Sequence, residues 1–513
     1  MSQPPVPPPA QGWPPHQPGP YQAQAPYPQP PPYAPAPTGP RHPGGPGGPG
    51  GPGSPGGGRR RLAVIVGCVL AALVVIGAGT AVLLRDSGDS GDPGPERAGG
   101  KPGGTTSASA TPKPTSVKGR ELFQVAAPEV NGAEYVATPG TWVTSRYYAS
   151  GAKNSVTGYD LTTGKLAWTV DLSGGLCQVS RDVTRNGLIA VVIRESTSER
   201  SSDCTRFAVI DVNKGTKVWE KPLKDDGIGR GADLTVAISD TVAAAGWPSG
   251  SAAFDASSGS PLWDAPAKGC IQEEHLGGGE QLLTLAYCRT ADGMRFRVGE
   301  RDPRSGKATW KYEIPKARGG AWLISSKPLV LGLIQSVNGL DAEQLVTVSE
   351  QGKVQSTIEL GDDYIAGCGD AGTCAATVVA GDTAYLASDP HAYGKANQIA
   401  AFDLRTGTRI QTFKAPGKST LIPVRADGKA LIALQKGDVS TAGRVLRLDP
   451  DTGQATTLLQ LPDEARLGLQ TLADKDVKHP ALYADGRLFL HRGSGYSEGD
   501  TSRIPMTLAY TNH

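Results

Sequence analysis

The chain has 513 residues, a formal net charge of +2 and a high content of Gly and Pro, with 68 and 43 residues. This length is too great for one simple core, so several units are expected. The small net charge and the lack of a basic stripe with interleaved aromatic residues argue against nucleic-acid binding.

The first part of the chain has the composition of a disordered tail. Residues 1–58 are mainly Pro, Gly, Gln, Ala and Tyr, with one arginine, Arg41, and no acidic residue. Because this segment has no aliphatic pattern to bury, it cannot offset the entropy cost of ordering. We therefore expect a disordered cytoplasmic tail with local polyproline II character. Its PPPY and PxxP runs are typical of ligands for aromatic grooves, but a solvated tether is the simpler interpretation.

A candidate transmembrane helix follows the tail. Arg59–Arg61 precede Leu62–Leu84, a run without a charged residue, which as a helix would span about 34 Å. The expected basic flank and transmembrane helix therefore occupy 59–84, and the three arginines favour a cytoplasmic N-terminus. A cleavable signal peptide is disfavoured because such a peptide normally begins near residue 1. A lipobox at Ile65–Cys68 is disfavoured because the apolar run continues well beyond Cys68.

Residues 85–118 are rich in Gly, Ser, Thr, Pro and Asp and predict a flexible extracellular linker. Six of the seven cysteines lie after the predicted span, which indicates disulfides in an oxidising compartment. We therefore expect a single-pass protein of the cell membrane with its C-terminal domain outside. A metal site is disfavoured, since no CxxC pair or nearby histidine accompanies the cysteines. Three local disulfides are expected: Cys177–Cys204, Cys270–Cys288 and Cys368–Cys374.

From residue 119 to residue 513 the sequence repeats with a period of about 48 residues. A copy consists of a short apolar strand, usually an Asp, and a turn that ends in Gly, and the clear copies add a Trp four residues after the Gly. Such a turn favours Gly, which reaches positive φ without a Cβ clash, and Asp, whose side chain bonds the turn amides. Weaker copies lack the Trp, and in one of them Val348 replaces the Asp. The turn glycines are Gly119, Gly164, Gly215, Gly259, Gly306, Gly352, Gly407 and Gly453.

Two further strand-like runs precede the turns. They are short, rich in Val, Ile, Leu and Ala, and bounded by Gly, Asp or Ser. With an outer strand, each period supplies a four-stranded antiparallel sheet, and such sheets repeated radially form a β-propeller. A helical solenoid is disfavoured because no apolar 3.6-residue pattern of useful length appears. The runs are Leu188–Ile193, Phe207–Val212, Gln281–Tyr287, Arg295–Val298, Leu329–Ile334, Gln344–Val348, Ala384–Ala387, Gln398–Leu404, Lys429–Leu434 and Arg444–Leu448.

The two ends of the repeat region predict how the ring closes. The C-terminal end supplies strands at Arg487–Leu490 and Met506–Tyr510 but no outer strand. Gly119–Phe123 matches Gly164–Trp168 in spacing and residue type, in phase with the other copies. The missing strand is therefore expected from the start of the domain, which removes open sheet edges. The count of turn glycines predicts an all-β, eight-bladed propeller, with seven blades as the alternative.

The repeat resembles the PQQ-like β-propeller family over residues 119–513, and the four copies with Asp, Gly and Trp carry the resemblance. That family includes pyrroloquinoline-quinone dehydrogenases, outer-membrane assembly scaffolds and extracellular sensor-like domains, so it does not by itself imply a cofactor. With its Pro-rich tail and single span, the chain looks like a membrane protein of actinobacteria. The resemblance implies that the Trp of each clear copy docks between neighbouring blades: Trp168, Trp219, Trp263 and Trp310. Phe123 occupies the matching position after Gly119 and is expected to dock in the same way.

No set of residues in the repeat region predicts catalysis, cofactor binding or a metal site. The fixed spacing of the tryptophans from the turns indicates packing rather than a cofactor-stacking surface. Some quinone dehydrogenases use a disulfide of adjacent cysteines, and this sequence has no Cys-Cys pair. Asp362, Asp363 and Asp370 near Cys368 fit a calcium or ligand loop, although a solvated loop is the simpler interpretation. The seven histidines are scattered, and no GxSxG, HExxH or phosphate-binding loop occurs.

These observations favour a non-enzymatic binding or scaffold module on the outer face of the membrane. Its loops are expected to bind a protein, peptide or glycan without a cofactor. One alternative is a PQQ-dependent dehydrogenase that also holds Ca²⁺. Another is a transmembrane sensor whose Pro-rich tail engages a cytoplasmic partner. The fold alone does not decide among these functions, because function resides in particular sites.

Overall fold

The computed structural model of this chain describes residues 117–127, 135–196, 202–223, 234–266, 270–278, 281–291, 293–314, 319–336, 342–361, 363–364, 366–368, 374, 376–388, 396–438, 441–473, 481–496 and 505–513. The predicted tail at 1–58, the predicted span at 62–84 and the linker up to residue 116 lie outside these residues. Within the described part of the chain, no helix has both the length and the apolar character needed to cross a bilayer.

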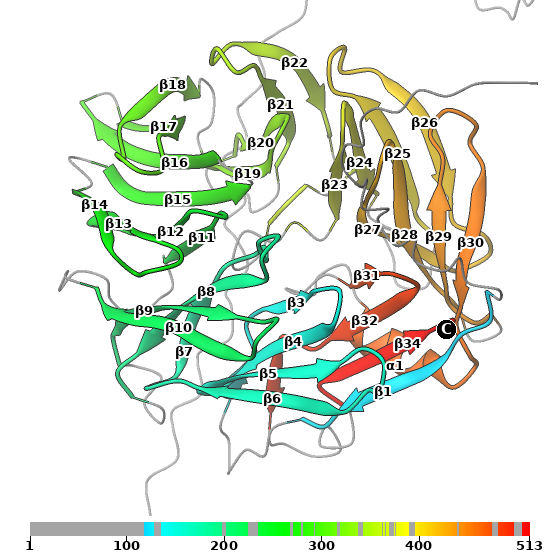
Figure 1. Cartoon of the computed structure of the whole chain (residues 1–513). Helices are drawn as coiled ribbons and strands as arrows, with labels where there is room; N and C mark the ends of the chain where they lie inside the picture. Colours follow the sequence, from blue (N-terminus) through cyan, green and yellow to red (C-terminus); the bar gives the residue numbers. More distant parts are fainter. Residues whose placement is uncertain are drawn as a thin grey trace, which may run out of the picture. The chain divides into compact units, whose positions relative to one another are not determined.

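Eight four-stranded antiparallel sheets, the blades, follow one another around a ring (Figure 1). This confirms the predicted all-β, eight-bladed propeller, and the alternative of seven blades is wrong. Blade 1 consists of β3 (Thr141–Val143), β4 (Tyr147–Ala152), β5 (Ser155–Asp160) and β6 (Leu166–Asp171), and blade 2 consists of β7 (Leu176–Val179), β8 (Leu188–Arg194), β9 (Cys204–Asp211) and β10 (Thr216–Pro222). Blade 3 consists of β11 (Thr235–Ile238), β12 (Val242–Trp247), β13 (Gly250–Asp255) and β14 (Pro261–Pro266). Blade 4 consists of β15 (Cys270–Gly278), β16 (Gln281–Thr290), β17 (Gly293–Arg301) and β18 (Ala308–Ile314).

The remaining blades follow the same order except for the last one. Blade 5 consists of β19 (Gly320–Ser326), β20 (Leu329–Ile334), β21 (Gln344–Val348) and β22 (Val354–Glu359). Blade 6 consists of β23 (Thr377–Ala380), β24 (Thr383–Ala387), β25 (Gln398–Asp403) and β26 (Arg409–Lys414). Blade 7 consists of β27 (Thr420–Asp427), β28 (Ala430–Lys436), β29 (Arg444–Leu448) and β30 (Ala455–Gln460). Blade 8 is β31 (Leu482–Ala484), β32 (Arg487–His491), β34 (Thr507–Thr511) and β1 (Arg120–Val125), and β2 (Tyr135–Ala137) pairs with β33 (Ser494–Tyr496).

The first strand of the domain closes the ring. β1 pairs antiparallel with β34, with Phe123 opposite Ala509 and Glu121 opposite Tyr510. The prediction that the N-terminal segment completes the last blade is therefore confirmed. Since the outer strand and the strand beside it come from opposite ends of the domain, the backbone hydrogen bonds of blade 8 join those ends directly.

A buried polar cluster ties blade 8 to blade 1. The Nδ1 atom of His491 lies 2.9 Å from the hydroxyl of Thr507, and its Nε2 atom lies 3.3 Å from the carbonyl oxygen of Thr138. The hydroxyl of Tyr148, on β4, lies 3.0 Å from the same Thr507 hydroxyl. Burial raises the pKa of Tyr148 well above its ordinary value. The cluster is paired internally, as buried polar groups must be to avoid a desolvation penalty.

The repeat turn adopts one conformation in seven of its eight copies. The turn glycines from Gly164 to Gly453 have φ between 64° and 74°. In blade 3 the amide of Gly259 donates to the carbonyl oxygen of Asp255, and the Asp255 carboxylate accepts from the amides of Ser257 and Ser258 at 3.1 and 2.9 Å. Hydrogen bonds to this carboxylate, first from the Ser257 hydroxyl, lower its pKa. The turn is therefore specified by both its glycine and its acid.

Gly119 departs from this pattern, and its prediction as a turn glycine is wrong. It precedes β1 and is not among the residues at positive φ. The physical reason is that its strand pairs with β34 from the far end of the chain, so no hairpin turn is needed. Gly119 keeps the packing role, however, since a Cβ placed on it would lie 2.6 Å from Leu459 of blade 7.

Five of the turn glycines face an aromatic side chain on the outer strand of the preceding blade. A Cβ on Gly259 would lie 2.8 Å from the Trp219 ring, and a Cβ on Gly215 would lie 2.3 Å from Cγ of Trp168. At these two positions no larger residue fits between the turn and the docking side chain. The five glycine and aromatic pairs are Gly164 with Phe123, Gly215 with Trp168, Gly259 with Trp219, Gly306 with Trp263 and Gly352 with Trp310.

Two tryptophans and a serine make the same hydrogen bond across different blade interfaces. The indole N–H of Trp219 donates to the carbonyl oxygen of Ala256, and that of Trp263 donates to Pro303, both at 2.9 Å. Ala256 and Pro303 each follow the repeat Asp of the next blade. In blade 5, where the Trp is lost, the hydroxyl of Ser356 donates to the equivalent carbonyl oxygen of Leu404. A small hydroxyl thus replaces the indole N–H as the donor.

One short helix lies between blades 7 and 8. Helix α1 spans Ala465–Leu472 and was not predicted from the sequence. It buries Ala465, Leu469 and Leu472, which lie on one face at helical spacing, against a core that includes Leu508. Two turns are too short to produce a sequence signal that stands out from the surrounding strands.

The contact between Gly259 and Trp219 can be tested with a matched pair of substitutions. Gly428 also has positive φ, 62°, but a Cβ placed on it would meet no atom within 4 Å, so Gly428→Ala should cost only the backbone strain of about 1–2 kcal/mol. Gly259→Ala should add about 1–3 kcal/mol because it also overpacks the Trp219 ring. Chemical denaturation of both variants measures the difference. Equal losses of stability would contradict the docking role.

Candidate functional site

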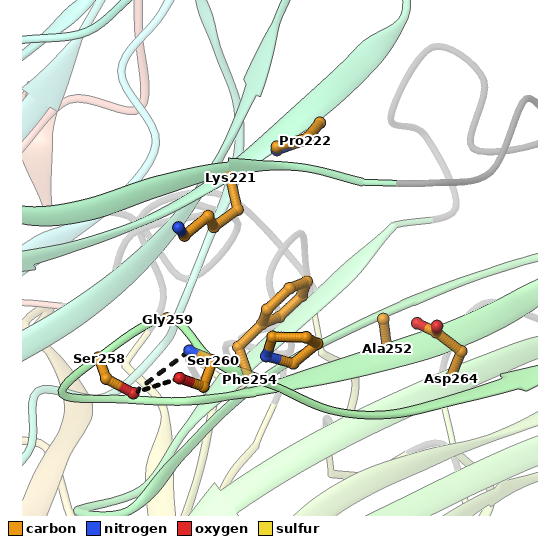
Figure 2. A pocket seen from close by; sticks show the side chains of 9 residues that line it. Lys221, Pro222, Ala252, Phe254, Ser258, Gly259, Ser260 and Asp264 are labelled. Atoms are coloured by element: carbon orange, nitrogen blue, oxygen red, sulfur yellow. Dashed lines mark hydrogen bonds between the residues drawn. The ribbon is translucent and has the colours of Figure 1, made fainter.

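The candidate site is a cleft between blades 2 and 3. Its volume is about 320 Å³, near the lower end of the range for small-ligand pockets. One wall comes from the end of β10 in blade 2, and the other comes from β13, β14 and the turn between them in blade 3 (Figure 2). The lining residues are Lys221, Pro222, Ala252, Phe254, Ser258, Gly259, Ser260, Pro261 and Asp264.

An ion cluster holds the blade 2 wall in place. The carboxylate of Glu220, next to Lys221 on β10, accepts a hydrogen bond from Lys217 at 2.6 Å and further bonds from Ser173 and Arg206. Ser173 lies in the connection between blades 1 and 2. Burial raises the pKa of Glu220, but the hydrogen bonds from Lys217, Ser173 and Arg206 outweigh it and lower the pKa to about 2. Glu220 is therefore a structural anion that fixes the strand carrying Lys221.

The blade 3 wall rests on the aromatic core between the two blades. The Phe254 ring lies 5.7 Å from the Phe207 ring and 5.6 Å from the Trp219 ring, and only 7% of Phe254 is exposed. The Ser258 hydroxyl donates to Asp255 at 3.0 Å and accepts from the amide of Ser260 at 3.3 Å. The turn that contains Gly259 packs against Trp219 of blade 2. This contact joins the two blades and therefore also sets the width of the cleft between them.

Opposite charges stand on the two walls. Figure 2 shows Lys221 on the strand of blade 2 and Asp264 on the facing strand of blade 3, with the Phe254 ring between them. Both side chains are exposed. Within the described part of the chain, neither side chain forms an ion pair. An apolar floor flanked by one cation and one anion suits a short amphipathic segment that carries charges of both signs.

The predicted disulfides are all formed, and this part of the sequence interpretation is confirmed. The bonded pairs are Cys177–Cys204, Cys270–Cys288 and Cys368–Cys374. The predicted docking residues lie at successive blade interfaces, so they do not gather into one stacking surface.

The acidic loop near Cys368 is described only in part. Asp363 is described, whereas Asp362 and Asp370 lie outside the described residues. Among the described residues, no three His, Cys, Asp or Glu side chains gather closely enough to hold a metal ion. Each disulfide joins cysteines that are not adjacent in sequence.

Sequence reasoning missed the cleft residues. Gly259 was identified, but as a turn residue, and Lys221 and Asp264 belong to no motif. Their relationship depends on how blade 2 faces blade 3, and no spacing along the chain encodes that. The only available signal was the position of both residues on outer strands, close to the repeat tryptophans Trp219 and Trp263.

Comparison with known proteins identifies the family. The family model described as outer membrane protein assembly factor BamB matches residues 113–275 and 152–413. The chain belongs to this family of PQQ-like propellers. No curated protein matches the chain significantly in sequence.

Several solved structures are similar to this PQQ-like propeller at low sequence identity. BamB from Moraxella catarrhalis is 14% identical, with a TM-score of 0.42, and the match covers 78% of this chain and 99% of that one. The quinohemoprotein alcohol dehydrogenase ADHIIG from Pseudomonas putida HK5 is 11% identical, with a TM-score of 0.45, covering 77% and 76%. The RRP9 WD40 repeats are 9% identical, with a TM-score of 0.35, covering 78% and 98%.

The anion at the blade 2 wall makes a pH-dependent contribution to stability. Because the pKa of Glu220 is lowered from 4.5 to about 2 on folding, its contribution is fully present above pH 4.5 and is lost as the pH falls through 2. At pH 7, Glu220→Gln should lower the free energy of unfolding by about 1–3 kcal/mol. Chemical denaturation at pH 7 and at acid pH measures this.

The matched control is Glu350→Gln, which removes an exposed carboxylate and should leave stability nearly unchanged. The difference between the Glu220→Gln variant and the wild type should shrink toward pH 2, because the wild-type carboxylate is then protonated as well. A difference that stays constant from pH 7 to pH 2 would show that the charge of Glu220 is not what holds the strand.

Proposed function

We propose that this chain is a non-enzymatic binding module, anchored in the cell membrane by one helix, with its propeller outside the cell. The cleft between blades 2 and 3 binds an extended peptide segment of a partner protein. Membership of the BamB family supports this proposal, since its model is described as an outer membrane protein assembly factor. The run at 62–84 supports the anchor through its apolar character and its lack of charge, and the three disulfides favour an oxidising location.

The observation that carries the proposal is the pairing of an apolar floor with opposite charges on two rigid walls. Lys221 and Asp264 come from different blades, so a ligand that meets both must bridge the blade interface. An extended peptide does this readily, because its side chains alternate in direction while its backbone can meet the hydroxyls of Ser258 and Ser260. The walls are held by Glu220 and by the seated turn, so little ordering cost is expected on binding.

The two perturbed acids beside the cleft, Asp255 and Glu220, also favour binding over catalysis at this site. The pKa of Asp255 is lowered by turn hydrogen bonds, and that of Glu220 is lowered by its cations and Ser173 against the effect of burial. The carboxylates of Asp255 and Glu220 are both engaged in structural hydrogen bonds, so we assign neither a catalytic role. The cleft therefore offers fixed charges and hydroxyls for recognition, and we propose no cofactor and no turnover.

A charge reversal in the cleft tests the proposal. Phage-displayed peptides selected on the purified full-length chain should lose at least tenfold in affinity, about 1.4 kcal/mol, when Lys221 is replaced by Glu. Lys414→Glu changes an exposed lysine at the end of β26, the outer strand of blade 6, and should leave affinity unchanged. Calorimetry or fluorescence anisotropy measures both variants.

Two results would contradict the proposal. Selected peptides whose affinity is indifferent to both Lys221→Glu and Asp264→Lys would place the binding surface elsewhere. Turnover of an alcohol or a sugar by the full-length chain supplied with pyrroloquinoline quinone and Ca²⁺ would show that the protein is an enzyme.

A further inference from the structure

One of the three disulfides differs from the others in its surroundings. Cys270 on β15 and Cys288 on β16 are directly opposite each other in the antiparallel ladder of blade 4 and are joined by a disulfide. Both residues are partly exposed. In the other two pairs, Cys177 is partly exposed but its partner Cys204 is fully buried, and Cys368 and Cys374 are 8% and 7% exposed. Solvent, and therefore a dissolved thiol, has access to both cysteines of the pair only in blade 4.

A guanidinium group lies against this disulfide. The Nη2 atom of Arg297 lies 2.8 Å from Sγ of Cys288 and 3.3 Å from Sγ of Cys270. Arg297 is on β17, opposite Ala286, so it lies on the same face of the sheet as Cys288, two residues further along β16. Glu313 lies 3.9 Å from Nε of Arg297, which leaves Nη2 directed at the sulfur atoms.

The position of this cation matters most when the disulfide is broken. Arginine stays protonated in proteins, so it interacts weakly with a neutral disulfide and strongly with a thiolate. A cation beside a cysteine lowers the thiol pKa, which makes that sulfur a better leaving group in exchange. It also stabilises the reduced form, and a disulfide whose reduced form is stabilised is easier to reduce.

We propose that Cys270–Cys288 is a thiol–disulfide exchange site for a protein dithiol on the outer side of the membrane. One thiolate of the donor attacks Sγ of Cys270, the donor–Cys270 bond forms, and the bond to Cys288 breaks. Cys288 leaves as a thiolate beside Arg297. The second donor thiolate then attacks the donor sulfur of the mixed disulfide and releases Cys270, which takes up a proton. The donor dithiol is oxidised to a disulfide, and two electrons reach the Cys270–Cys288 pair.

The fold allows this exchange without loss of the blade. β15 and β16 remain paired through residues from Gln272–Tyr287 to Gly278–Gln281, and β16 remains paired with β17. On the opposite face of the sheet, the Tyr287 ring of β16 and the Phe296 ring of β17 are in contact, with centroids 4.7 Å apart. The disulfide closes a loop of modest length within an already paired hairpin, so its removal should open the chain little.

The experiment is an equilibrium reduction of the full-length chain in its native state. The protein is held at pH 7 in buffers with a series of reduced to oxidised dithiothreitol ratios, quenched with acid, alkylated and digested, and the thiol fraction at each cysteine is quantified by mass spectrometry. Cys270 and Cys288 should become half reduced at a ratio at least tenfold lower than the other two pairs require. The other two disulfides serve as internal standards in the same sample.

Substitution of Arg297 tests the role of the cation. Arg297→Gln should make the Cys270–Cys288 pair about tenfold harder to reduce, a shift of about 30 mV, and should raise the pH at which reduced Cys288 becomes alkylated. Arg297→Lys should restore part of both effects because it keeps the charge. Arg289→Gln is the matched control, since Arg289 is exposed and adjacent to Cys288 but on the opposite face of the sheet.

The outcomes are decisive either way. Selective early reduction of Cys270–Cys288 that depends on Arg297 but not on Arg289 supports the proposal. Reduction of all three pairs at one ratio, or a midpoint that Arg297→Gln leaves unchanged, would overturn it. If Arg297→Gln lowers thermal stability, the proposal is tested on the reduced wild-type chain, in which the rate of Cys288 alkylation is measured as a function of pH. A thiol pKa at the ordinary value in that measurement would contradict a thiolate stabilised by Arg297.

Discussion

The structure depends on one recurring contact, in which the repeat turn of a blade packs against the outer strand of the blade before it, and seven of the eight blades have this turn. The turn needs a residue at positive φ, and at Gly215 and Gly259 the side chain beneath leaves no room for a Cβ. Glycine satisfies both requirements at once. Where the docking residue is Trp219 or Trp263, its indole N–H also bonds the next blade. Adjacent blades are therefore fixed in position and in rotation by one glycine and one side chain.

This contact explains why the blade number could be predicted from the sequence and why other features could not. The glycine spacing repeats because the geometry repeats, and the phase of Gly119 predicted ring closure even though its turn is absent. The replacement of Trp by Ser356 left no signal, because a hydroxyl that reaches Leu404 depends only on the final backbone separation. The helix at Ala465–Leu472 was also hidden, since two turns bury too few residues to show a period.

The residues around the cleft and around the disulfides could not be predicted from the sequence. All six cysteines could be paired from their positions within repeats, and the structure forms those bonds. Their chemical differences were invisible, because Arg297 reaches Cys288 through strand register and not through proximity in sequence. Lys221 and Asp264 likewise line one cleft because the turn at Gly259 packs against Trp219 of blade 2. The repeat predicts the scaffold, and the register between its parts creates the sites.

The cleft between blades 2 and 3 and the disulfide in blade 4 are close in the ring, yet different residues form them. The joint between blades 3 and 4 includes Trp263, whose indole N–H donates to Pro303 in the turn between β17 and β18. The disulfide lies between β15 and β16, at the other side of the blade from that turn. The disulfide is therefore not part of the contact between Trp263 and Pro303, and neither of its cysteines lines the cleft. The proposed peptide binding and the proposed thiol–disulfide exchange therefore use different residues, and neither proposal requires the movement of a blade.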